Sequence, residues 1–139
     1  MKLYLSEFAV SDTIARDARY DLAIEAVLTF CVGSGVACQR SDDFADYAEI
    51  ERRIDEADVV LALIDRFWTS STWKWHELAY AAGGPSIVAA RRGKKNPHRM
   101  AMLVDSADLP AGLARDTAPL LVIRTMAELH VALAGAFSG

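Results

Sequence analysis

The sequence predicts an α/β fold in which helices cover both faces of a mainly parallel sheet. Short apolar runs alternate along the chain with segments whose apolar residues recur every three or four positions, as strands and amphipathic helices do. The run at residues 58–65, DVVLALID, is apolar between its two aspartates, which is typical of a central strand with helices on both sides. Right-handed crossovers between such strands build a three-layer sandwich.

The chain has the length and composition of one domain, residues 1–139. With 53% hydrophobic and 24% charged residues, it has enough apolar side chain for a core. We expect five strands in the flavodoxin-like order 2-1-3-4-5, formed by the runs at 2–5, 36–39, 58–65, 86–90 and 120–123. A further run at 100–104, MAMLV, is interpreted as an additional edge strand or as part of a longer connection.

Start and stop signals place the helices. Ser-Asp-Thr at 11–13 predicts the start of a helix that ends at the Gly-Ser-Gly of 33–35. Spacings of three and four predict a second helix that carries Tyr47, Ile50, Ile54 and Ala57. A third follows the Ser/Thr caps at 70–72, and a final helix runs from about Met126 to Phe137.

Charge and apolar runs exclude several classes of partner. A net charge of −4 gives no electrostatic reason to expect nucleic acid. No run approaches the roughly 18 apolar residues that span a bilayer, and no secretory signal is found, so we expect a soluble, cytoplasmic protein without a membrane partner. Cys31 and Cys38 lack metal-ligand spacing and are expected to be reduced core residues.

Common catalytic motifs are missing from the sequence. There is no GxxxxGK[ST] loop or GxSxG elbow, and the Gly-Ser-Gly at 33–35 follows a helix rather than a strand, so it is no dinucleotide fingerprint. The three histidines, His76, His98 and His130, are not spaced as metal ligands. We therefore expect no metal site and no hydrolase triad.

Ligands of such sheets bind at the carboxyl ends of the strands, where the strand order reverses. That position lies between strands 1 and 3, beside the loops at 6–12 and 65–73. Trp73 and Glu77 are four residues apart and share one face of the helix that follows. A carboxylate beside an indole suits an oxocarbenium-like ribosyl centre, which indicates cleavage of an N-glycosidic bond.

The segment from Glu49 to Ala82, together with the N-terminal LYLSEFAVSD, resembles Toll/interleukin-1 receptor (TIR) domains. The matching positions are Trp68, Ser71, Trp73 and Glu77-Leu78, with Trp73 to Glu77 as the WxxxE element. In catalytic TIR domains this glutamate is required to cleave NAD into nicotinamide and ADP-ribose or cyclic ADP-ribose. The resemblance therefore implies an NADase that uses Glu77, takes NAD as substrate, and needs no metal or other cofactor.

The same resemblance implies the rest of the site and its partners. The substrate pocket would be lined by Ser6, Glu7, Phe8, Arg40, Phe44, Asp65, Ser71 and Trp73. TIR–TIR contacts would form a homo-oligomer, activated in signalling or antiphage defence, with a fused or associated sensor domain. Two departures stand out: RSDDFAD at 40–46 replaces the usual Arg-Asp-x-x-Pro-Gly loop, and no C-terminal Phe-Trp box is found.

Three alternatives stay open. HELAYAAGGPSIV and the strand that ends in Asp65 are similar to nucleoside 2-deoxyribosyltransferases, in which the glutamate is a covalent nucleophile, although the Gly-Pro usual in their first loop is missing here. A noncatalytic TIR-type interaction module also fits the pattern. Taken alone, WxxxE fits a solvated helical Glu77 with Trp73 as core packing.

Overall fold

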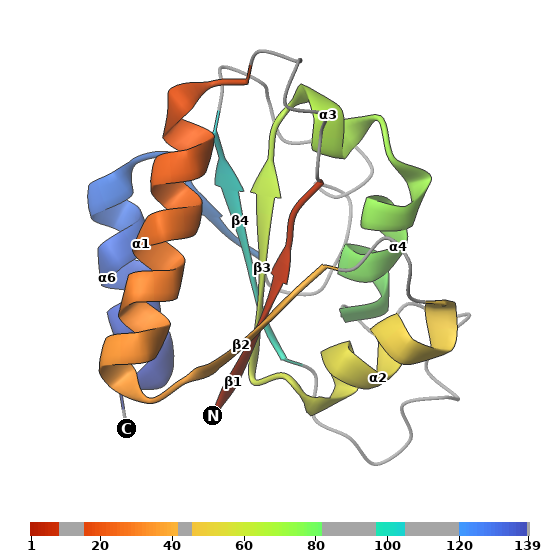
Figure 1. Ribbon diagram of the computed structural model, residues 1–139, viewed down its shortest axis with the longest axis horizontal. Helices are drawn as coiled ribbons and strands as arrows, with labels where there is room; N and C mark the ends of the chain where they lie inside the picture. Colours follow the sequence, from red (N-terminus) through yellow and green to blue (C-terminus); the bar gives the residue numbers. More distant parts are fainter. Residues whose placement is uncertain (9–15, 42–45, 82–96, 105–119, 139) are drawn as a thin grey trace.

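The computed structural model describes residues 1–8, 16–41, 46–81, 97–104 and 120–138 (Figure 1). Its elements in chain order are β1 (Lys2–Ser6), α1 (Ala18–Ser34), β2 (Ala37–Arg40), α2 (Tyr47–Glu56), β3 (Val59–Ile64), α3 (Arg66–Thr69), α4 (Thr72–Ala81), β4 (His98–Leu103), β5 (Leu120–Ile123) and α6 (Met126–Phe137).

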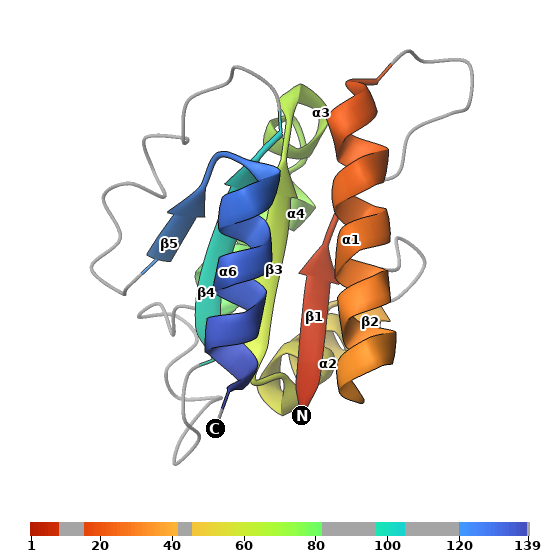
Figure 2. The same ribbon diagram turned by 90° about the vertical axis from the view of Figure 1, so that its left-hand side faces the viewer.

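The sheet has five parallel strands in the order β2-β1-β3-β4-β5, which confirms the predicted fold class. Helices α1 and α6 cover one face, and α2 and α4 cover the other (Figures 1 and 2). Each face has its own core, because alternate residues of a strand point to opposite sides. In β1, Leu3 and Leu5 pack under α1, whereas Tyr4 packs towards α2 and α4.

The interpretation of residues 100–104 as an edge strand or connection is wrong. Residues 100–103 belong to β4, an interior strand hydrogen-bonded to both β3 and β5. Met100 and Met102 enter the core under α1 and α6, while Ala101 and Leu103 enter the opposite core, so the strand is buried on both faces. The run at 86–90 lies outside the described residues.

The first helix starts at a different signal from the one expected. Asp17 caps α1, accepting the N–H of Arg19 at 2.9 Å, while residues 11–13 lie outside the described part of the chain. At the other end Gly35 adopts φ 68°, the left-handed conformation that glycine tolerates best, so the predicted stop is confirmed.

The later helices agree with the sequence, with one addition. Helices α2 and α6 occupy the predicted positions, and Ser71 Oγ accepts the N–H of Lys74 at 3.4 Å where α4 begins. The expected loop at 65–73 is interrupted by the short α3. Asp65 causes this turn, because its Oδ1 accepts the N–H groups of Phe67 and Trp68.

Two further expectations concern membrane spans and thiols. Among the helices in the described ranges, none is both long and apolar enough to cross a bilayer. Cys31 and Cys38 are free thiols, as predicted; Cys31 is buried and Cys38 half-buried. Burial raises the pKa of Cys38 to about 12, so this thiol stays protonated at neutral pH.

Candidate functional site

Glu77 is fully buried and its carboxylate is held by side chains from β1. Tyr4 donates its hydroxyl to Oε1 at 2.9 Å, and Ser6 donates to Oε2 at 2.5 Å. Lys74 Nζ lies 3.3 Å from the same Oε1, and the Lys74 side chain is only 1% exposed. A buried ion pair with two additional hydroxyl donors therefore lies between α4 and the sheet.

Simple periodicity explains this arrangement. Lys74 and Glu77 are three residues apart, so they share one face of α4. Tyr4 and Ser6 are two apart in β1, so they point to the same side of the sheet, and that side faces α4. Ser6 is the last residue of β1, which places the Glu77 carboxylate by the carboxyl end of this strand.

Trp68 fixes the hydroxyl of Ser6. The buried Trp68 indole donates its Nε1–H to Ser6 Oγ at 3.1 Å, while Ser6 donates its own proton to Glu77. Because the hydroxyl accepts one hydrogen bond and donates another, its orientation is determined. A relay of two hydrogen bonds thus connects α3 to α4 through the end of β1.

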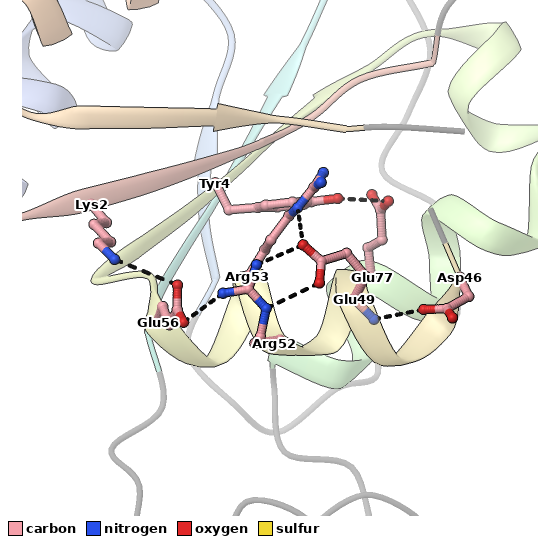
Figure 3. Close-up of polar contacts among 8 residues, drawn as sticks. All are labelled: Lys2, Tyr4, Asp46, Glu49, Arg52, Arg53, Glu56 and Glu77. Carbon is pink, nitrogen blue, oxygen red and sulfur yellow. Dashed lines mark hydrogen bonds and ion pairs between the residues drawn. The ribbon is translucent and has the colours of Figure 1, made fainter. Parts of the chain in front are cut away.

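Tyr4 acts as a neutral hydrogen-bond donor. Burial raises the pKa of Tyr4 well above its usual value, and the charge of Glu77 raises it further. Figure 3 shows the Tyr4 hydroxyl pointing at the Glu77 carboxylate, with the ion pairs of α2 nearby. Proton transfer from Tyr4 is therefore unfavourable, and its contribution is to hold Oε1 in place.

A second polar cluster crosses the carboxyl ends of β1 and β3, at the point where the strand order reverses. Arg16 donates its Nε–H to Asp65 Oδ2 at 2.6 Å and its Nη1–H to the carbonyl of Phe8 at 2.5 Å. Its guanidinium carbon lies 3.3 Å from the centroid of the Tyr20 ring. Arg16 therefore joins the segment after β1 to the end of β3.

A third contact ties β1 to β2. Arg40 Nε donates to Glu7 Oε1 at 2.6 Å, and the Glu7 N–H donates to Ser41 Oγ at 3.1 Å. Ser41 in turn donates its hydroxyl to the carbonyl of Leu5. The segment that follows β1 is thus anchored on both of its neighbours.

The structure does not bring the predicted site residues into one cluster. Ser6 contacts Glu77 directly; Phe8 and Asp65 are linked through Arg16; Glu7 and Arg40 pair with each other. Ser71 caps α4 without touching the carboxylate in any described contact. Trp73 lies on α4, but its side chain and the whole of Phe44 are outside the described residues.

The interpretation of Glu77 as a solvated helical residue is wrong, because none of its surface is exposed. The sequence did not identify Tyr4 and Lys74 as neighbours of Glu77. It also did not identify Arg16 as the link between the segment after β1 and the end of β3. Two of these had a usable signal: Lys74 is three residues before Glu77, and Tyr4 is two before Ser6. Arg16 had none, since it is 49 residues from Asp65.

Fold and site together define the class of this protein: an α/β domain with a five-stranded parallel sheet and a buried, hydrogen-bonded glutamate by the carboxyl end of β1. No family model matches the chain, and neither the curated proteins nor the solved structures contain a match. Within the described residues, no group of three His, Cys, Asp or Glu side chains is arranged to hold a metal ion.

Proposed function

We propose that the protein is an NAD nucleosidase that breaks the bond between nicotinamide and ribose, with Glu77 as the catalytic residue. The observation that supports this best is the position of the Glu77 carboxylate, held by Ser6 by the carboxyl end of β1. Ligands of parallel α/β sheets bind at this edge. The TIR-like sequence around Trp73 and Glu77 supports the choice of NAD.

In the proposed reaction the N-glycosidic bond breaks and its electron pair leaves with nicotinamide, which departs uncharged. Water then adds to ribose C1′, giving ADP-ribose and one proton; attack by an adenine nitrogen instead gives cyclic ADP-ribose. Glu77 would offset the positive charge that develops on the ribosyl ring. Tyr4 and Ser6 would keep the two carboxylate oxygens in a fixed orientation.

Because Glu77 is buried, this function requires a change in the structure around its carboxylate. Its carboxylate is inaccessible in the structure, so substrate reaches it only after a local rearrangement. We propose that self-association through TIR–TIR contacts produces the accessible state, in a cytoplasmic signalling or defence role with a fused or associated sensor. Activity should then rise with protein concentration more steeply than in proportion.

A noncatalytic TIR-type interaction module is the second candidate, and the Lys74–Glu77 ion pair favours it. An ammonium 3.3 Å from Oε1 already offsets the carboxylate charge. A fully buried pair whose carboxylate also accepts hydrogen bonds from Tyr4 and Ser6 is what a purely structural role requires. The two candidates therefore differ in whether Glu77 affects chemistry or only the fold.

One assay separates these functions. The purified domain, at low and high concentration, is incubated with NAD and separately with a deoxynucleoside plus a free base. Nicotinamide release supports the nucleosidase, base exchange supports the transferase alternative, and inertness throughout supports the interaction module. Release that is unchanged in Glu77→Gln, with the exposed Glu25→Gln as matched control, would exclude Glu77 as the catalytic residue.

A further inference from the structure

Two buried polar atoms by the carboxyl end of β1 have no hydrogen-bond partner among the described residues. They are Glu7 Oε2 and Arg16 Nη2. The other atoms of both side chains are engaged: Glu7 Oε1 with Arg40, and Arg16 Nε and Nη1 with Asp65 and Phe8. Buried polar groups are normally paired, so one free acceptor and one free donor need an explanation.

Tyr20 of α1 connects the segment that contains Glu7 with Arg16. The Arg16 guanidinium lies against the Tyr20 ring. Burial raises the pKa of Tyr20, Arg16 opposes that rise, and the nearby charge of Glu7 adds to it. Phe8, the residue after Glu7, donates its N–H to the Tyr20 hydroxyl and accepts from Arg16. Arg16 thus contacts Tyr20 directly and Glu7 is linked to it through the adjacent Phe8, while Glu7 and Arg16 do not pair with each other in any described contact.

We propose that Glu7 Oε2 and Arg16 Nη2 form a subsite for the cis-diol of a ribose, the sugar of a nucleotide substrate. This rests on the proposed function for its choice of a nucleotide. A carboxylate oxygen accepts from one hydroxyl while a guanidinium N–H donates to the oxygen of the other. In dinucleotide-binding α/β sheets of a related type, an acidic side chain likewise hydrogen-bonds the ribose 2′-hydroxyl.

The local charge favours a neutral sugar over a phosphate. The cluster contains two cations, Arg16 and Arg40, and two anions, Glu7 and Asp65, so its formal charge is zero. A phosphate beside Arg16 would also face the carboxylate of Asp65, 2.6 Å from the guanidinium. A diol meets no such repulsion, since a hydroxyl can donate to one charged group and accept from the other.

The subsite and the candidate catalytic residue lie on the two sides of one strand end. Ser6 points to α4 and Glu77, whereas the next residue, Glu7, precedes Phe8, which contacts Arg16 and Tyr20 on the α1 side of the sheet. A sugar above the end of β1 would meet the diol ligands on one side and Glu77 on the other. Both unpaired atoms are shielded in this structure, so binding requires local rearrangement there.

Equilibrium binding of AMP and dAMP tests the subsite, because these nucleotides differ only in the 2′-hydroxyl. Titration calorimetry of the whole chain should give a preference of about tenfold or more for AMP, from charge-assisted hydrogen bonds. Glu7→Ala and Arg16→Met should bring the AMP-to-dAMP ratio close to one. The matched exposed variants, Glu25→Ala and Arg124→Met, should leave the ratio unchanged.

Glu7→Gln, which preserves the shape of the side chain, keeps the test valid if Glu7→Ala or Arg16→Met impairs folding. Its amide oxygen can still accept from Arg40, while the loss of charge should lower the AMP preference several-fold. Equal affinities for the two nucleotides, tighter binding of dAMP, or no binding of either at millimolar concentration would overturn the subsite. Failure of the subsite can be distinguished from failure of the proposed function. If the protein releases nicotinamide but the Glu7 variants leave the AMP-to-dAMP affinity ratio unaltered, only the subsite is rejected. AMP preference without NAD cleavage rejects the function alone.

Discussion

The buried ion pair between Lys74 and Glu77 predicts a strong coupling in stability. Both side chains are almost completely removed from water, 1% and 0% exposed, and their charged atoms are 3.3 Å apart. Replacing either one alone leaves the other charge buried without its counter-ion. Glu77→Gln and Lys74→Met should each destabilise the fold, whereas the double variant removes both charges together.

The magnitude follows from the cost of an uncompensated buried charge, about 3–5 kcal/mol when one partner of such a pair is removed. Tyr4 and Ser6 still donate to Glu77 in Lys74→Met, so the loss there should be near the lower end, about 3 kcal/mol. A chain of 139 residues is expected to have a total stability of about 7–20 kcal/mol. Each single variant should therefore remain folded but measurably weakened.

Urea denaturation followed by circular dichroism measures the double-mutant cycle. The loss in the double variant should be smaller than the sum of the single losses by about 2 kcal/mol or more, because the charges are removed together. The exposed pair of Arg52 and Glu49 is the control; it is shorter, at 2.6 Å, yet should show much weaker coupling in water. Additive losses below about 1 kcal/mol each for Lys74 and Glu77 would refute the buried pair.

Two further predictions concern the hydrogen bonds of Ser6 to this pair and the exposed ion pairs of α2. Ser6→Ala removes a hydrogen-bond donor to Glu77 and the acceptor of the Trp68 indole. It should lower the free energy of unfolding by about 1–3 kcal/mol for each group left unpaired, measured by the same urea denaturation. A smaller loss would contradict the relay through Ser6. Hydrogen bonds from Arg52 lower the pKa of Glu49 from 4.5 to about 2, so its contribution to stability is complete above about pH 5 and is lost as the pH falls towards 2. In an acid titration followed by circular dichroism, Glu49→Gln should therefore lose stability less steeply across that window, and an unchanged slope would contradict the assigned pKa.

The strand order was predictable because it depends mainly on patterns that are local in sequence. Alternating strands and helices leave few right-handed arrangements of a parallel sheet. The role of residues 100–104 was not predictable in the same way. An apolar run fits an interior strand as well as a covered edge strand, and only the hydrogen bonds of β4 to both neighbours distinguish the two.

The candidate site was predictable in position but not in environment. Glu77 could be placed near the strand ends from the helix start at Ser71 and the central strand before it. Its burial depends on how α4 packs against β1, which brings Tyr4 within 2.9 Å across 73 residues of sequence. The spacing of Tyr4 from Ser6 predicts that both face one side of the sheet, but it does not predict which helix covers them, and nothing periodic links Arg16 to Asp65.

The ion pair also determines which variant can decide between the two candidate functions. Glu77→Gln alone is ambiguous, because a loss of nicotinamide release could come from the weakened fold as well as from the missing carboxylate. The double variant of Glu77→Gln and Lys74→Met separates these causes, since it should recover stability without recovering the catalytic charge. A stable double variant that does not cleave NAD assigns Glu77 to the chemistry, provided that Lys74→Met alone, which keeps the carboxylate, remains active. If the wild-type chain is also inactive at every concentration, the pair belongs to the core of an interaction domain. Replacing both residues by apolar residues of similar volume should then leave the fold stable.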